Sequence, residues 1–106
     1  MSDPVYQVIG EAADVAENRG KAYMVDGVQI AVIRHEGKLY AVDEFCTHAD
    51  ASLAFGHVKD GCVACPWHYA EFDLETGAAK SLPAVEAVKT YPVRETEDGK
   101  IEVALG

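Results

Sequence analysis

Residues 46–68 carry the sequence CTHADASLAFGHVKDGCVACPWH, which contains two short pairs of potential metal ligands. Cys46 and His48 form the first pair, and Cys65 and His68 form the second. Sixteen residues separate the two pairs. Each pair offers one thiolate and one imidazole from a tight loop, and two such loops can hold a single metal centre between them.

Two kinds of metal centre accept this set of ligands. A binuclear iron–sulfur cluster with two imidazoles on one iron takes one cysteine and one histidine from each of two facing loops. A tetrahedral zinc site also accepts two thiolates and two imidazoles, since Cys2His2 ligation is common for zinc. The ligands alone therefore leave an iron–sulfur protein and a zinc-stabilised interaction domain as alternatives.

The segments on both sides of this stretch are typical of β-strands. After this stretch, a hairpin is predicted around Asp98-Gly99, because apolar residues alternate along residues 91–105. The helix-like stretch Glu11 to Glu17 is too short for more than a turn or two. We therefore expect an all-β antiparallel sandwich or partly open barrel. Four runs rich in Val, Ile and Tyr precede the ligand stretch, at Val5 to Ile9, Lys21 to Val25, Val28 to Arg34 and Lys38 to Val42.

Residues 45–84 differ in composition from the rest of the chain. Glycine and proline punctuate them, and they hold all three cysteines and three of the four histidines. Functional residues tend to lie on loops that a rigid scaffold holds in place. We therefore predict a single domain over residues 1–106, with an inserted loop-rich lobe at about 45–84 that binds the metal centre.

The net charge and the hydrophobic pattern argue against nucleic acid and membranes as binding partners. Eighteen acidic against nine basic residues give a formal net charge of -9, which repels phosphate backbones and anionic lipid surfaces. The chain lacks the roughly 20 consecutive apolar residues that span a bilayer. Its N-terminus also lacks the basic region of a signal peptide. We expect a cytoplasmic monomer that binds neither nucleic acid nor membrane.

The paired motif resembles that of Rieske-type ferredoxins, in which C-x-H is followed by a spacer of about this length and then by C-x-x-H. The resemblance implies one Rieske 2Fe-2S cluster, with Cys46 and Cys65 on one iron and the two histidines, His48 and His68, on the other. It also implies that residues 81–83 cover the cluster as a third loop. Further residues fall where that family usually has them, namely Gly56, Gly61, Pro66, Phe72, Gly77 and Pro83.

A free-standing Rieske ferredoxin resembles the middle component of bacterial ring-hydroxylating dioxygenase systems. There the ferredoxin takes one electron at a time from a flavin-dependent NAD(P)H reductase and passes it to a terminal oxygenase. The sequence has no G-x-G-x-x-G nucleotide motif and no sign of a catalytic triad, so we expect a carrier and not an enzyme. A small Rieske subunit of another oxidoreductase, such as nitrite reductase, is the alternative within the same family.

Residues after the second ligand pair predict a low reduction potential. High-potential Rieske proteins of respiratory chains resemble one another in placing a Ser and a Tyr hydroxyl there, whereas this chain has Ala70 and Phe72. Hydrogen bonds to the cluster sulfurs raise the potential, so their loss lowers it. Outside the motif, we expect Cys62 to pack as a small buried apolar side chain. We expect His35, beside the Glu36-Gly37 turn, to face solvent.

Overall fold

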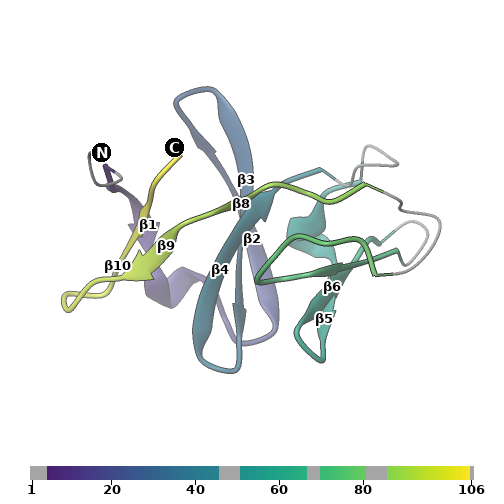
Figure 1. Cartoon of the computed structure of the whole chain (residues 1–106). Coiled ribbons are helices and arrows are strands. Elements are labelled where there is room, and N and C mark those ends of the chain that lie inside the picture. Colours follow the sequence, from purple (N-terminus) through teal and green to yellow (C-terminus); the bar gives the residue numbers. More distant parts are fainter. Residues whose placement is uncertain (1–4, 46–50, 67–69, 81–85, 106) are drawn as a thin grey trace.

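The computed structural model describes residues 5–45, 51–66, 70–80 and 86–105, and they form three antiparallel sheets (Figure 1). The first sheet contains β1 (Gln7–Glu11), β10 (Lys100–Val103) and β9 (Val93–Glu95), in that order. The second contains β2 (Arg19–Val25), β3 (Val28–His35), β4 (Lys38–Asp43) and β8 (Thr90–Tyr91). The third contains β5 (His57–Lys59), β6 (Cys62–Ala64) and β7 (Glu71–Asp73). The predicted all-β antiparallel fold is confirmed.

Strand β3 lies in the middle of the molecule because both of its faces are apolar. Ile30 and Val32 point to one side and belong to a buried cluster with β10. Ala31 and Ile33 point to the other side and belong to a buried cluster with the third sheet. A strand that is buried on both faces needs a packed layer on each side. The second sheet is therefore the central layer between the first sheet and the lobe.

The lobe contains a small sheet of its own, which the sequence did not predict. Strands β5, β6 and β7 have three residues each, so they are too short to show an alternating pattern. A tight turn at Asp60 and Gly61 joins the first two strands, and both residues have positive φ angles, 53° and 78°. The loop-rich region is thus built on a rigid hairpin.

The strand boundaries differ from the prediction at several ends; strand β2 (Arg19–Val25), for example, begins two residues earlier than expected. Strand β1 begins at Gln7, two residues later than expected. Residues 91–93 were expected in one hairpin, but Tyr91 pairs with Ala41 of β4 whereas Val93 pairs with Val103 of β10. Pro92 lies between them and has no N–H to donate to a ladder, so the chain changes sheet at this point. The helix-like stretch forms only the single 3-10 turn η1 (Ala12–Asp14).

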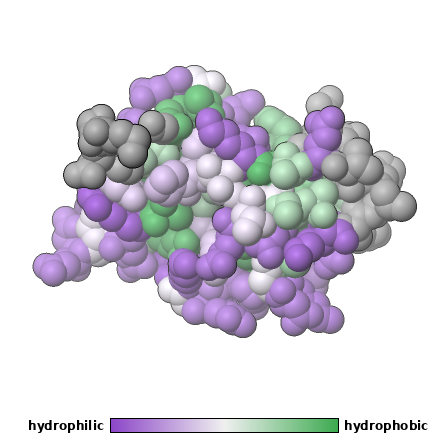
Figure 2. All heavy atoms as spheres, in the orientation of Figure 1, coloured by the Kyte–Doolittle hydropathy of each residue, from purple (hydrophilic) through white to green (hydrophobic). Residues whose placement is uncertain are grey.

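The surface in view is mostly hydrophilic, with small separate apolar areas (Figure 2). None of the described segments forms a helix with the length and apolar character that crossing a bilayer requires. Five large apolar side chains of the described residues are strongly exposed: Val5, Val8, Met24, Phe45 and Phe55.

Candidate metal centre

Cys65 is the one predicted ligand within the described residues. It follows β6, and its side chain is completely buried. Its backbone N–H donates to the carbonyl oxygen of Ala70 at 2.7 Å, which extends the β6–β7 ladder by one more pair. The segment 66–69 therefore starts and ends on a fixed base.

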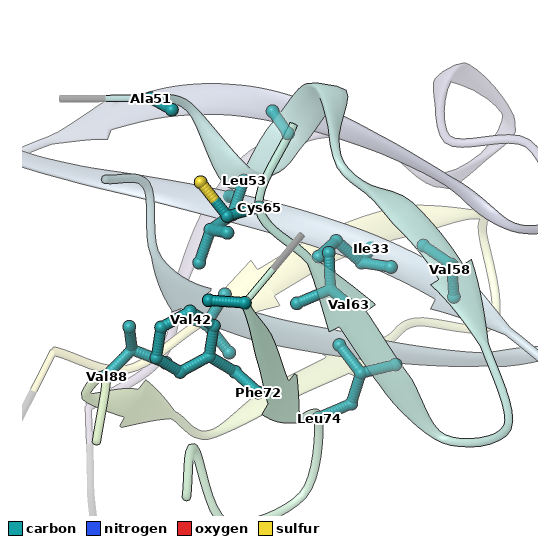
Figure 3. Close-up of a cluster of buried hydrophobic side chains, with 13 residues drawn as sticks. Ile33, Val42, Ala51, Leu53, Val58, Val63, Cys65, Phe72, Leu74 and Val88 are labelled. Carbon is teal, nitrogen blue, oxygen red and sulfur yellow. The ribbon is translucent and has the colours of Figure 1, made fainter. Parts of the chain in front are cut away.

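The sulfur of Cys65 lies at one end of the buried cluster of the lobe. Figure 3 shows it on the side where Ala51 lies, away from Phe72 and Leu74. The thiol is free. Ala51 is the first described residue after the segment 46–50, so the sulfur lies near the base of the first predicted ligand loop.

The base of this first loop is also fixed by hydrogen bonds. Phe45 and Ser52, which flank the loop, form an isolated antiparallel bridge. The N–H of Leu53 donates to the carbonyl oxygen of Glu44 at 2.6 Å. The Ser52 hydroxyl donates to the Glu44 carboxylate at 2.9 Å. A backbone bridge and a hydrogen bond between side chains therefore hold the ends of this loop together.

A third segment leaves the lobe at the same end. The N–H of Lys80 donates to the carbonyl oxygen of Glu71 at 2.7 Å, and Glu71 pairs with Ala64 beside Cys65. Residues 81–85 follow directly, and the chain returns at Val88, whose N–H donates to Gly77 at 2.9 Å. The register thus places Cys65, Ala70 and Lys80 at one end of the lobe, whereas Val88 joins the lobe at the Gly77 turn.

Cys46, His48 and His68 lie outside the described residues, so their place in the ligand set stays a prediction. Among residues 5–45, 51–66, 70–80 and 86–105, no three His, Cys, Asp or Glu side chains gather as a metal site. Cys65 fits a metal-bound thiolate, because a free sulfur is held on a rigid base next to the other loop. This donor suits an iron–sulfur cluster or zinc equally.

Cys62 differs from Cys65 in its surroundings. It pairs with Asp73 and is half-buried, so the expectation of a buried side chain was wrong. Partial burial, and then the charges of Asp73 and Glu71, raise the pKa of its thiol. A raised pKa keeps the sulfur protonated, which disfavours binding to a metal.

His35 is buried, so the expectation that it faces solvent was wrong. Only 7% of the residue is exposed. The N–H of Gly61 donates to its Nε2 at 3.0 Å, so Nδ1 carries the proton and donates to the Asn18 side-chain oxygen at 2.7 Å. The turn after β3 lies against the β5–β6 turn, which no local sequence pattern indicates. His35 therefore joins the central sheet to the lobe.

Replacing His35 by alanine should lower the free energy of unfolding by about 1–3 kcal/mol, because the Gly61 N–H loses its acceptor in a buried place. His57→Ala is the matched control, since His57 is exposed and should change stability by less than about 0.5 kcal/mol. Urea unfolding of both variants measures the difference. Equal stability of the two variants would show that His35 does not anchor the lobe.

The sequence as a whole matches a known family. The profile of the Rieske [2Fe-2S] domain matches residues 5–92. The anthranilate 1,2-dioxygenase ferredoxin subunit of Burkholderia cepacia is 39% identical over 98 residues, which are 92% of this chain and 90% of that protein. The matched residues 5–92 span both predicted ligand pairs, and the family is that of a 2Fe-2S cluster and not of zinc.

Solved structures have the same fold. The ferredoxin of Sphingomonas yanoikuyae B1 superposes with a TM-score of 0.86 at 31% identity, covering 96% of this chain and 100% of that one. A chain from the complex of oxygenase and ferredoxin in carbazole 1,9a-dioxygenase gives 0.83 at 27% identity, covering 96% and 94%. A putative nitrite reductase small subunit from Mycobacterium tuberculosis gives 0.87 at 26% identity, covering 99% and 98%. This chain therefore belongs to the Rieske [2Fe-2S] domain family, and its cofactor is one Rieske-type 2Fe-2S cluster.

Proposed function

We propose that this chain is a one-electron carrier between a flavin-dependent NAD(P)H ferredoxin reductase and the terminal oxygenase of an aromatic-ring-hydroxylating dioxygenase. The observation that carries the proposal is 39% identity to a dioxygenase ferredoxin subunit over nearly the whole chain. The bound cluster accepts and releases a single electron. A solved relative with 27% identity is in a complex of oxygenase and ferredoxin, which supports an oxygenase as partner.

This proposal includes the cluster ligands, which are Cys46, His48, Cys65 and His68. It also includes a single domain over residues 1–106, in which the lobe at about 45–84 binds the cluster. Cys65 supports it, because its sulfur lies between the fixed bases of two loops. Imidazoles have an outer ring nitrogen that can reach the surface, whereas thiolates end at the metal. Electrons therefore leave through the two histidines, at a tip that reductase and oxygenase share.

The proposed carrier acts as a monomer in the cytoplasm, where its NAD(P)H-dependent reductase finds its substrate. A formal charge of -9 disfavours association between copies. It also attracts basic partner surfaces, so electron transfer should slow as salt rises. Carriers that exchange partners form small interfaces, below about 1,200 Å².

We also propose a low reduction potential. Ala70 and Phe72 are completely buried and carry no hydroxyl. The Ala70 carbonyl accepts the N–H of Cys65, so the side chain at position 70 starts close to a proposed ligand. A donor added there can reach a sulfur of the site.

Ala70→Ser should raise the midpoint potential by tens of millivolts, up to about 130 mV, since a hydrogen bond to a charged acceptor is worth about 1.5–3 kcal/mol. Ala104→Ser is the matched control, because Ala104 is equally buried but belongs to the first-sheet side of the molecule. Redox titration of both variants checks the result. A potential that moves equally in both, or in neither, would mean that sulfur hydrogen bonding at position 70 does not set it.

The function itself is tested by electron delivery. The reduced protein is mixed without oxygen with the oxygenase of the anthranilate or carbazole system, and its absorbance is followed. We expect reoxidation at a rate that falls with ionic strength and that a redox-inactive oxygenase inhibits. The second candidate function is that of a nitrite reductase small subunit. It is supported by the similar fold of a putative subunit of that kind, which is 26% identical to this chain. Stable binding to a nitrite reductase large subunit, with no transfer to either oxygenase, would favour that candidate.

A further inference from the structure

Three of the exposed apolar side chains surround the base of the first ligand loop. Phe45 directly precedes the loop and is 39% exposed. Phe55 is 79% exposed and ends the 3-10 turn η2 (Leu53–Phe55), which begins next to Ser52, the bridge partner of Phe45. Met24 of β2 is 67% exposed. We call Met24, Phe45 and Phe55 the apolar shoulder.

Met24 lies on the same side of the molecule as η2. Side chains two apart in a strand share a face, so Gly20 and Met24 lie on one face of β2. A Cβ on Gly20 would lie 2.8 Å from the carbonyl oxygen of Ala54, which places η2 over that face. The partner of Met24 across the hairpin is Gln29, whose carbonyl accepts the N–H of Glu44 at 3.1 Å. Met24 and η2 therefore lie over the same face of the central sheet, and Phe45 is linked to this region through its bridge with Ser52.

The backbone under Phe55 is rigid. The Ser52 hydroxyl accepts the N–H of Ala54 at 3.3 Å and caps the turn. On the other side, a Cβ on Gly56 would lie 2.5 Å from the carbonyl oxygen of Ala64, so η2 is wedged between β2 and β6. Leu53 and Ala54 are buried by this packing. The backbone of Phe55 is thus fixed in advance, so binding costs no further backbone entropy at this residue.

Phe55 also forms one wall of an open hollow of about 520 Å³. Gly56, His57 and Val58 continue the wall on the lobe, and Glu17, Asn18 and Arg19 line the opposite side. The Glu17 carboxylate accepts the N–H of Gly37, which lowers its pKa and keeps it charged. Protein interfaces commonly have aromatic residues at the centre and polar residues at the rim, as in this hollow.

We propose that the apolar shoulder is the face on which the terminal oxygenase docks, with Phe55 as its main anchor. The inference rests on the proposed carrier function and goes beyond it, because it extends the docking surface from the ligand tip along β2 and η2. The oxygenase surface that fits it has an apolar pocket for the Phe55 ring with basic side chains around it.

Two observations favour the oxygenase over a second copy of this chain. The shoulder is continuous with the base of the ligand loop, where the electron must leave, so a partner seated there shortens the transfer distance. The formal charge of -9 on each copy opposes contact between copies and favours a basic partner.

Stopped-flow transfer from the reduced cluster-loaded protein to the oxygenases of the anthranilate and carbazole systems tests the proposal. Phe55→Ser should lower the second-order rate constant about tenfold. Phe55→Leu should keep most of the rate, since it remains apolar. Val8→Ser is the matched control, because Val8 is 58% exposed on β1 and should change the rate by less than about twofold.

Potential, absorbance spectrum and reduction by dithionite should be the same in all variants, which separates docking from damage to the site. If Phe55→Ser and Val8→Ser transfer electrons at equal rates, the docking face is refuted while the carrier function stands. If the wild-type protein transfers to neither oxygenase, the carrier function is refuted and the docking face with it. A similar loss in Phe55→Ser and Phe55→Leu, with stability unchanged, would refute an apolar anchor.

Discussion

Replacing Cys65 by serine should abolish assembly of the cluster, leaving purified protein almost without iron and acid-labile sulfide. Iron–sulfur clusters are held by thiolates, and a serine hydroxyl is too weak an acid to replace one at neutral pH. The Cys65 sulfur lies on a fixed base beside the first loop, and a serine hydroxyl would take its place there. Iron and sulfide analysis, together with the visible absorption spectrum, measures the effect.

Cys62→Ser provides the matched control for this prediction. It makes the same chemical change three residues away in the same lobe. Because the Cys62 thiol has a raised pKa and is paired across the sheet with Asp73, its loss should leave two irons and two sulfides per chain. Loss of the cluster in Cys62→Ser, with retention in Cys65→Ser, would show that the ligand assignment is wrong.

Gly77→Ala should lower the free energy of unfolding by about 2–5 kcal/mol. Gly77 has φ +77°, and a Cβ there would lie 2.0 Å from the carbonyl oxygen of Val88. The two residues are joined by a hydrogen bond of 2.9 Å, so the lobe and the returning chain must separate to make room. Conformational strain of about 1–2 kcal/mol and a steric clash of about 1–3 kcal/mol act together.

Gly27→Ala separates these two effects. Gly27 has φ +82° in the turn between β2 and β3, but no atom lies within 4 Å of the position of a Cβ. It should therefore cost only the conformational strain, about 1–2 kcal/mol. Urea unfolding of the cluster-loaded variants gives both values. Equal losses in the two variants would show that the contact between Gly77 and Val88 does not stabilise the protein.

Much of the fold could be predicted from local patterns of sequence. Strand β3 (Val28–His35) is rich in β-branched residues, and it lies where a strand over Val28 to Arg34 was expected. The hairpin around Asp98-Gly99 was also found, because its alternation and its turn residues agree. Such strands and hairpins depend mainly on residues that are close together in the sequence.

The remaining features depend on contacts between distant segments. His35 follows a strand and precedes a turn, which is typical of an exposed residue, yet the β5–β6 turn covers it. Tyr91 and Val93 alternate as in one strand, yet they belong to different sheets because Pro92 interrupts the ladder. No pattern within a few residues can show either outcome.

For the candidate site too, some features could be predicted from the sequence and others required the structure. The spacing of cysteines and histidines predicted a metal centre and left an iron–sulfur cluster and zinc as alternatives. The resemblance to Rieske-type ferredoxins implied the cluster, and the family match confirms one Rieske-type 2Fe-2S cluster. The structure adds the fixed base of Cys65 and the bridge between Phe45 and Ser52. The apolar shoulder had no signal in the sequence, since an apolar residue such as Phe55 is more often buried than exposed.

A redox titration followed by electron paramagnetic resonance tests whether the chain is a low-potential Rieske carrier. We expect a single one-electron transition in the low part of the Rieske range, with the low average g value that mixed nitrogen and sulfur ligation produces. Metal analysis of the same sample should give two irons per chain. A reduced sample without a resonance and with one zinc per chain, or an average g value typical of four cysteine ligands, would contradict it.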